Sequence, residues 1–266
     1  MMLKLTDDNY HSKKANSQYL SVSTFKSFLP WYSYGCEAKA LAKINGEWEE
    51  EPSSAMLVGS YVHAWASDEL DEFMANTPEL FKQNGGLYAK YKHADKMIET
   101  IASDDYMMKV LQGGKEEIIT GELFGVPWKA KIDVINDVKE SFTDLKTTRE
   151  IGRDYYNEHA QEYQNFITYW GYDIQMAVYA ELIKQQRKLD SYYMPHIAVV
   201  DKQDPPDKAV IYFGTDWIQD KLEELEIVAE RVVDVWAGKK EPNRCGKCDY
   251  CRSTKKITES IYWKDF

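Results

Sequence analysis

The chain has 266 residues, of which 44% are apolar, so its length permits one domain or two and a substantial core. Its net charge of −11 argues against a nucleic-acid-binding protein with a broadly basic surface. No run approaches the roughly 18 to 20 apolar residues of a membrane span, and the first eight residues lack the apolar stretch of a secretory signal. We therefore expect a cytoplasmic protein.

The first part of the chain predicts helices. Ser21 or Ser23 can cap a helix that runs toward Phe28, where Pro30 interrupts it. Further helices are predicted at residues 36–44, 54–70 and 88–111, the last as one or two helices that end at Gly113-Gly114.

The second part alternates strands and helices. Short turns at Gly125 and Asn136-Asp137 predict strands at about 115–123, 126–136 and 139–147. A helix at 170–188, strands near 195–201 and 208–213, and an amphipathic helix at 215–236 follow. A mixed sheet with helices on both faces is an α/β fold.

Two of these strands carry carboxylates. In an extended strand residues i and i+2 share a face, so Asp144 and Lys146 project side by side toward whatever Asp133 faces. Hard divalent cations take one or two carboxylates, and a nearby lysine can act on a water or offset phosphate charge. The alternative is that the aspartates are turn residues and Lys146 is a solvated charge.

Two predicted helices carry polar pairs at a spacing of four residues. Gly59 and His63 share one helical face, and Gln175 and Tyr179 share another. A glycine at this position would let a strand approach the helix, with His63 one turn further along. The alternatives are a packing glycine beside a half-buried histidine, and an ordinary helix flank.

The cysteines suggest a second site. Cys245, Cys248 and Cys251 form two consecutive Cys-x-x-Cys steps, a spacing that suits a tetrahedral metal or an iron-sulfur cubane better than an intracellular disulfide. Cys36 can supply a fourth ligand only if the fold brings the two ends of the chain together. Free thiols or an adventitious disulfide are the alternatives.

In their order and spacing, Gly59 with His63, Asp133, Asp144 with Lys146, and Gln175 with Tyr179 resemble the RecB-like branch of the PD-(D/E)xK nuclease superfamily. The resemblance spans roughly residues 20 to 255. The segment at 19–28 also resembles the one that precedes the nuclease core in RecE-type phage exonucleases. The family resemblance implies one domain over residues 1–266. This domain would comprise a helical part at about 20–112, a restriction-endonuclease-like catalytic core at about 113–236, and a cysteine-rich segment at 240–266.

The resemblance also implies roles for residues. His63, Asp133 and Asp144, with the Leu145 carbonyl, would hold Mg²⁺ or Mn²⁺, and Lys146 would act on the nucleophilic water. Gln175 and Tyr179 would line the DNA channel, and Arg149 is a further candidate for DNA binding. The second acidic position is Asp144, where many members carry Glu. Spacing does not decide whether a further acid completes the metal shell; the candidates are Glu117 and Glu122.

The same branch contains nucleases in which one early cysteine and three late ones bind a [4Fe-4S] cluster that joins the termini. For Cys36, Cys245, Cys248 and Cys251 the resemblance therefore implies an iron-sulfur cluster. The spacing before the last cysteine is shorter than in the better-known members, so zinc stays an alternative.

The function that this resemblance implies is a metal-dependent DNA exonuclease. It would resect linear duplex ends for recombination in a phage or prophage setting, as a homo-oligomer that hands the exposed strand to a single-strand annealing protein. The alternatives are a single-strand exonuclease like the CRISPR-associated members and a non-catalytic DNA-binding or assembly module.

Charge and aromatic residues bear on how DNA would bind. Acidic clusters at 47–51, 67–72 and 223–230 are expected to lie far from the site, and a local basic channel is expected from five residues: Lys129, Lys131, Lys146, Arg149 and Arg153. Seven aromatic residues crowd the stretch 155–172. They could stack on frayed bases, or they could form a packed core or a subunit interface.

Overall fold

The computed structural model describes residues 2–31 and 35–264, and its centre is a five-stranded mixed sheet of order β1-β2-β3-β6-β7. β3 and β6 are parallel and the other neighbours are antiparallel. The bounds are β1 (Gly114–Leu123), β2 (Val126–Asn136), β3 (Ser141–Thr148), β6 (Met194–Asp201) and β7 (Lys208–Tyr212). The predicted α/β class and all five predicted strands are confirmed.

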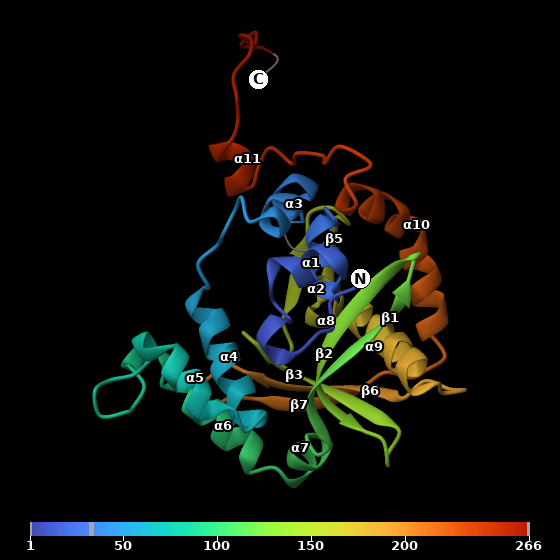
Figure 1. The fold of residues 1–266 in the computed structure, drawn as a ribbon. Coiled ribbons are helices and arrows are strands. Elements are labelled where there is room, and N and C mark those ends of the chain that lie inside the picture. The colour runs from blue at the N-terminus through green and yellow to red at the C-terminus, as the bar shows by residue number, and fades with distance from the viewer. Residues whose placement is uncertain (1, 32–34, 265–266) are drawn as a thin grey trace.

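Helices cover both faces of the sheet (Figure 1). α9 (Tyr172–Arg187) and α10 (Ile218–Trp236) lie on one face, and α4 (Ser54–Ala66), α6 (His93–Ala102) and α7 (Asp105–Val110) lie on the other. In β6, Ile197 points into the first hydrophobic cluster and Ala198 into the second, as the alternation of a strand with two covered faces requires. The sheet therefore lies between two packed layers of helices.

β2 and β3 separate near their middle. They pair only where 134–136 of β2 meets 141–143 of β3, after which β2 continues along β1 and β3 continues along β6. Asp133 and Asp144 are the next residues beyond the last pair. The fork between the strands leaves space at these two aspartates, and that space positions the candidate site.

The predicted helix at 54–70 is divided in two. α4 ends at Ala66, Asp68 adopts a positive φ of 64°, and α5 (Leu70–Asn76) begins in a new direction. A hairpin of β4 (Asp154–Asn157) and β5 (Glu162–Asn165), followed by α8 (Phe166–Tyr169), fills the stretch after β3, where no strand was predicted.

Residues 2–19 pack onto the core. They include α1 (Lys13–Gln18), which comes before α2 (Val22–Phe28) and α3 (Glu37–Asn45). The Lys129 ammonium is buried against this segment, where it donates to the Tyr10 carbonyl and, at 2.7 Å, to Asn16 Oδ1. The expectation that Lys129 lines a basic channel is therefore wrong, because its charge is enclosed.

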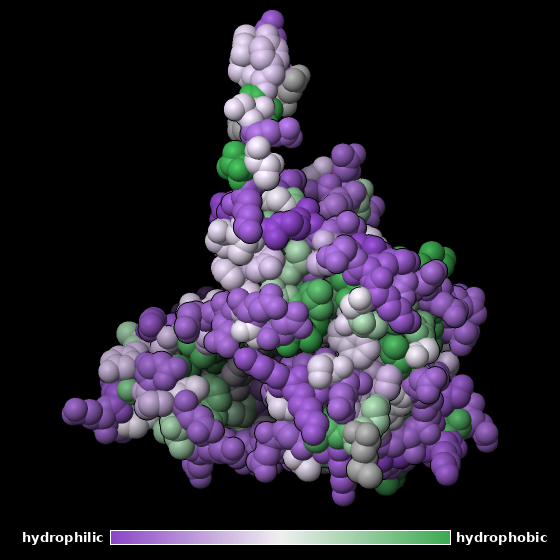
Figure 2. All heavy atoms as spheres, turned by 45° about the horizontal axis from the view of Figure 1, so that its top comes forward, coloured by the Kyte–Doolittle hydropathy of each residue, from purple (hydrophilic) through white to green (hydrophobic). Residues whose placement is uncertain are grey.

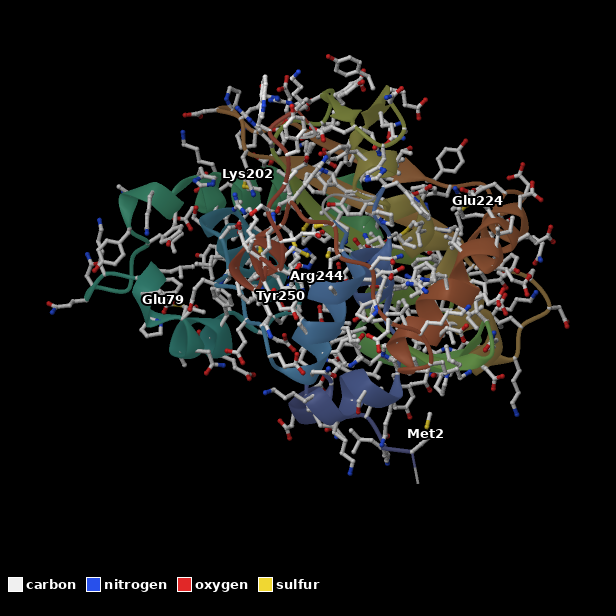
Figure 3. All side chains as sticks on the ribbon, turned by 90° about the horizontal axis from the view of Figure 1, so that it is seen from above. Met2, Glu79, Lys202, Glu224, Arg244 and Tyr250 are labelled. Atoms are coloured by element: carbon white, nitrogen blue, oxygen red, sulfur yellow. The ribbon has the colours of Figure 1, made fainter. Side chains whose placement is uncertain are left out.

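The C-terminal segment returns to the N-terminal helices. Arg231 of α10 forms a bidentate ion pair with Glu37 of α3, and Glu37 also accepts the backbone N–H of Asn243 at 2.6 Å. α11 (Asp249–Ser253) packs on α3, and Arg244 and Tyr250 lie over the blue N-terminal helices in Figure 3. Beyond α11 the exposed chain projects from the body (Figure 1).

The face seen in Figure 2 is largely hydrophilic, with scattered apolar residues, as the charged composition requires. Within the described residues, the helices are too short or too polar to cross a membrane.

Candidate active site

Gly59 lets α4 lie close against β3. A Cβ built at Gly59 would stand 3.0 Å from Thr147 Oγ1, which is closer than most side chains tolerate. The hydrogen of glycine removes this contact, so the helix approaches the strand as the Gly-x-x-x-His spacing predicted. One turn further along α4, His63 faces the fork between β2 and β3.

His63, Asp133 and Leu145 meet at the fork. His63 Nδ1 lies 3.4 Å from Asp133 Oδ2, and the same carboxylate oxygen accepts the backbone N–H of Leu145 at 2.7 Å. This second contact ties the end of the paired region of β2 to β3. Three residues that are far apart in sequence therefore share one small volume.

Asp144 is the buried carboxylate of the site. Its Oδ1 accepts a 2.5 Å hydrogen bond from Gln175 Nε2, and its Oδ2 lies 2.5 Å from Lys146 Nζ. The second contact has the distance of an ion pair without the angles of a hydrogen bond. Among the described residues, Asp144 Oδ2 is thus a buried acceptor that lacks a hydrogen-bond donor.

Burial and the neighbouring charges shift the pKa values of the titratable groups of the site. Burial and the charge of Asp144 raise the pKa of Asp133 well above its usual range. Burial and then the Lys146 ammonium lower the pKa of His63, so its imidazole is neutral at pH 7. Burial opposes the charge of Lys146, but the neighbouring Asp144 raises its pKa overall. The site therefore combines carboxylates that repel each other, a neutral imidazole and an ammonium.

These donors fit a hard divalent ion. Mg²⁺ and Mn²⁺ prefer carboxylate and carbonyl oxygens, and an imidazole is compatible with Mn²⁺. A buried carboxylate oxygen costs free energy unless a cation compensates it; at Asp144 Oδ2 the Lys146 ammonium does so, and the same oxygen has the chemistry of a metal ligand. His63, Asp133, Asp144 and the Leu145 carbonyl are the groups that could hold the ion.

The remaining predicted residues have different surroundings. Tyr179 lies one turn from Gln175 and packs against Phe142, with 6.5 Å between the ring centroids, at the edge of the first hydrophobic cluster. Arg149 is exposed in the loop after β3. The DNA-binding roles of Gln175, Tyr179 and Arg149 stay predictions.

A cavity of about 740 Å³ opens beside the site, and its lining includes an acid that the sequence analysis missed. Glu116 lies in it with His63, Asp133 and Lys146. Of the two acids proposed from sequence, Glu117 forms an ion pair with Arg187 at 2.6 Å and Glu122 is exposed. The register of β1 against β2 could have identified Glu116. Lys115 pairs with Val134 and Glu117 pairs with Ile132, so Glu116, between them, lies opposite Asp133.

The lining of this cavity includes further acids. Glu69 and Glu72 line it together with His11, so the expectation that the cluster at 67–72 lies far from the site is wrong. Lys131, expected in the basic channel, is paired with Asp7 and Glu116 at 3.2 and 3.1 Å. The basic channel predicted from sequence therefore loses Lys131 as well as Lys129.

Lys26 and Tyr172 support the site from the side of α9. The Lys26 ammonium donates to the Trp170 carbonyl at 2.7 Å and lies 5.5 Å from the Tyr172 ring, whose other neighbour is Lys146 Nζ at 4.8 Å. Burial, and next the charge of Lys146, lower the pKa of Lys26 to about 8. Both lie in segments noted from the sequence, Lys26 in 19–28 and Tyr172 in the aromatic stretch 155–172, but neither was predicted to contact the site.

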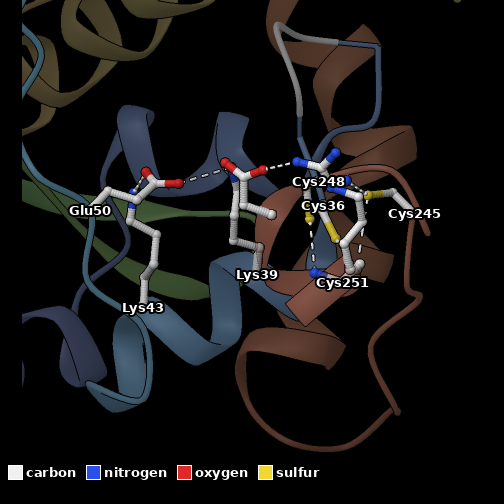
Figure 4. A network of polar contacts seen from close by, with 9 residues as sticks. Cys36, Lys39, Lys43, Glu50, Cys245, Cys248 and Cys251 are labelled. Carbon is white, nitrogen blue, oxygen red and sulfur yellow. Dashed lines mark hydrogen bonds and ion pairs between the residues drawn. The ribbon is translucent and has the colours of Figure 1, made fainter. Parts of the chain in front are cut away.

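The four cysteines converge at a second site (Figure 4). Their sulfur atoms all lie within 4.8 Å of one another, with Cys36 3.6 Å from Cys251 and Cys245 3.9 Å from Cys251. The backbone N–H of Cys248 donates to Cys245 Sγ at 3.3 Å, and that of Cys251 donates to Cys248 Sγ at 3.4 Å. The prediction that the fold brings Cys36 to the late cysteines is confirmed.

The spacing of the sulfurs bears on which metal fits. Four thiolates on one tetrahedral zinc, with Zn–S of about 2.3 Å, stand about 3.8 Å apart. A [4Fe-4S] cluster places each thiolate on a different iron, which separates the sulfurs further. Although burial opposes it, N–H groups that include that of Cys248 lower the pKa of Cys245 to about 6, whereas burial raises the pKa of Cys36 and raises that of Cys248 to about 12, so Cys245 deprotonates more readily than those two. The four residues fit a metal, and the short distances favour a single ion.

Comparison with known proteins agrees with this architecture. Residues 21–254 match the family described as "PDDEXK-like domain of unknown function (DUF3799)". The crystal structure of a putative exonuclease from Eubacterium rectale superposes with a TM-score of 0.91 at 39% sequence identity, covering 99% of this chain and 98% of that one. A search of curated proteins found no match. The chain belongs to the PDDEXK-like family.

Proposed function

We propose that this protein is a metal-dependent DNA exonuclease that hydrolyses phosphodiester bonds. The observation that carries the proposal is the convergence of His63, Asp133, Asp144 and Lys146 at the fork between β2 and β3. The Eubacterium rectale protein, similar over nearly its whole length, carries the description "putative exonuclease", which supports the same activity here.

The metal would polarise the scissile phosphate and lower the pKa of the attacking water. Lys146 has a raised pKa, so at neutral pH it is an ammonium that donates hydrogen bonds. It therefore offsets the negative charge that develops on the phosphate and orients the water, and it does not itself remove a proton. Tyr172 and Asp144 contact this ammonium from two sides and fix its position.

Gln175 holds Asp144 in the orientation that this arrangement needs. Its amide fixes Asp144 Oδ1, which leaves Oδ2 directed at the space shared with Lys146. A carboxylate held at one oxygen keeps the other available to a cation, because it cannot rotate to satisfy both oxygens elsewhere.

The test is digestion of end-labelled linear DNA with added Mg²⁺ or Mn²⁺. Wild-type protein should release nucleotides from linear DNA and leave a closed circle intact, and EDTA should stop the release. Lys146→Ala should lose at least about a hundredfold in rate. Lys96→Ala removes an exposed lysine paired with Asp204 and should be unaffected. Release that is equal in both variants, or independent of metal, would show contamination and end the proposal.

The finer features stay predictions of the family resemblance. They are RecE-type resection of duplex ends, a role in phage recombination, a homo-oligomer and a single-strand annealing partner. At the cysteine site we propose one zinc ion in place of the iron-sulfur cluster that the resemblance implied, because all four sulfurs lie within 4.8 Å.

A further inference from the structure

The β4–β5 hairpin lies in the chain between the strand with Lys146 and the helix with Gln175. Tyr156 of β4 and Tyr163 of β5 are directly opposite each other, with 5.3 Å between the ring centroids. The two residues are 50% and 73% exposed. Two adjacent rings in solvent are an unusual feature of a hairpin, because burying them elsewhere would stabilise the fold.

The hairpin is joined to the candidate active site by a series of contacts. Tyr155, on the other face of β4, lies 4.8 Å from Tyr169 and 5.8 Å from Trp170 between ring centroids. The Trp170 carbonyl accepts from Lys26, which lies near the ring of Tyr172. That ring lies 4.8 Å from Lys146 Nζ, so a continuous series of contacts reaches from the catalytic lysine to the base of the hairpin.

A cavity of about 340 Å³ adjoins Tyr156 of the exposed pair. Tyr156 and Tyr169 line it together with Trp31 and His159, and on another side it borders Cys245 and Cys248 of the cysteine site. Rings on several sides and a volume of this size fit a flat heterocycle such as a nucleobase.

The charged residues of the hairpin do not by themselves form a DNA-binding surface. Among the described residues, Arg149 and Arg153 form no ion pair with a carboxylate, and the Arg153 guanidinium lies 5.5 Å from the Tyr155 ring. The hairpin itself carries Asp154, Glu158 and Glu162. The arginines at its base can contact phosphates, whereas the tip is polar and carries Glu158 and Glu162, so the exposed Tyr156–Tyr163 pair is the apolar surface that the hairpin offers.

From these observations we infer that the β4–β5 hairpin binds unpaired bases of the DNA strand that enters the active site, through stacking on Tyr156 and Tyr163. Bases inside a duplex stack on each other and expose only their edges, so exposed tyrosines select single-stranded or frayed DNA. The inference rests on the proposed exonuclease function. It specifies the substrate of that function as a strand with unpaired bases near the scissile bond.

The test measures binding and cleavage separately. In a Lys146→Ala background, which slows digestion at least about a hundredfold, a single-stranded oligonucleotide with 2-aminopurine near its end reports stacking through a change in fluorescence. Removing both rings with Tyr156→Ala and Tyr163→Ala should weaken the Kd for this probe by about tenfold or more. The double replacement by Phe, which keeps the rings, should retain most of the affinity.

Tyr212→Ala is the matched control, because Tyr212 is 70% exposed on β7 and outside the hairpin. With Lys146 intact, the double Ala variant should lose cleavage of single-stranded ends more than cleavage of blunt duplex. Unchanged probe affinity would overturn the inference. So would a change of oligomeric mass without a change in affinity, since that would identify the tyrosine pair as a subunit contact.

The two proposals fail separately. Absence of metal-dependent cleavage in the wild type refutes the exonuclease proposal. Cleavage that is present but equal in the Tyr→Ala double variant and in Tyr212→Ala refutes only the role of the hairpin.

Discussion

Gln175 of α9 donates a 2.5 Å hydrogen bond to Oδ1 of Asp144, and both side chains are buried. The contact joins a helix on one face of the sheet to the carboxylate at the strand fork. It fixes which oxygen of Asp144 remains for Lys146 and a metal. The residue expected to line a DNA channel thus has a definite structural task at the carboxylate.

Replacing Gln175 by Leu should therefore impair metal use more than folding. The leucine fills a similar volume but leaves Asp144 Oδ1 without its donor, so the carboxylate can rotate away from the ion. We expect kcat/KM to fall about 10- to 100-fold and the Mn²⁺ concentration for half-maximal activity to rise. Titrating activity with Mn²⁺ measures both effects.

Gln219→Leu on α10 is the matched control, since Gln219 contacts Glu223 at the surface. A Gln175→Leu variant with the Mn²⁺ requirement of the wild type would show that Asp144 is oriented by other contacts.

Two buried lysines predict how stability depends on pH. Burial lowers the pKa of Lys129 from 10.5 to about 8, and burial with the charge of Lys146 does the same for Lys26. Between pH 8 and 10.5 these lysines are protonated in the unfolded chain and largely neutral in the folded one. The free energy of unfolding therefore rises with pH from about 8 toward 10.5. Urea unfolding between pH 7.5 and 10 should show the free energy of unfolding increasing.

Lys129→Met should flatten this increase, because methionine keeps the apolar stem and does not titrate. Lys96→Met, at an exposed position, should leave the slope unchanged. A slope equal in wild type and Lys129→Met would mean that the ammonium is solvated through an opening in the folded state.

The cysteine site should contain about one zinc ion per chain. Cys36→Ser removes the ligand that ties α3 to the late cysteines, and Tm should fall by about 10 °C, as expected for a loss of about 3 to 4 kcal/mol in a chain of this size. Metal analysis of purified protein and a thermal scan with and without chelator provide the measurements. Iron and inorganic sulfide in equal amounts, after anaerobic purification, would instead support the [4Fe-4S] alternative.

The parts of this structure that could be predicted from sequence are those with a local signal. The alternation of β2 and β3 and the turns between them gave the strands, and the spacing of Asp144 and Lys146 gave a shared face. The meeting of Cys36 with the late cysteines required knowledge of related proteins, because nothing near Cys36 encodes it.

The parts that could not be predicted depend on tertiary contacts. Lys129 has the same local pattern as an exposed strand lysine, and only the packing of residues 10–16 over β2 encloses it. Glu69 and Glu72 reach the cavity because α4 ends at Ala66 and the chain turns at Asp68. The hairpin at 154–165 is rich in aromatic residues, but its short strands give too few alternations to be distinguished from a loop.

The contact between Gly59 and Thr147 gives a prediction that tests how closely α4 must approach β3. Gly59→Ala should keep activity within about threefold, because Thr147 Oγ1, 3.0 Å from the added Cβ, can rotate away and alanine favours the helix. Gly59→Val adds two further carbons, which should displace α4 and separate His63 from Asp133, with a loss of activity of about a hundredfold for a shift near 1 Å.

Thr147→Ala alone should remain near wild type. The double variant Gly59→Val with Thr147→Ala should recover part of the lost activity, because the space vacated by Oγ1 accepts a methyl group. Equal activity of the single valine variant and the double variant would show that the helix yields at another contact, and circular dichroism of all four proteins separates this result from unfolding.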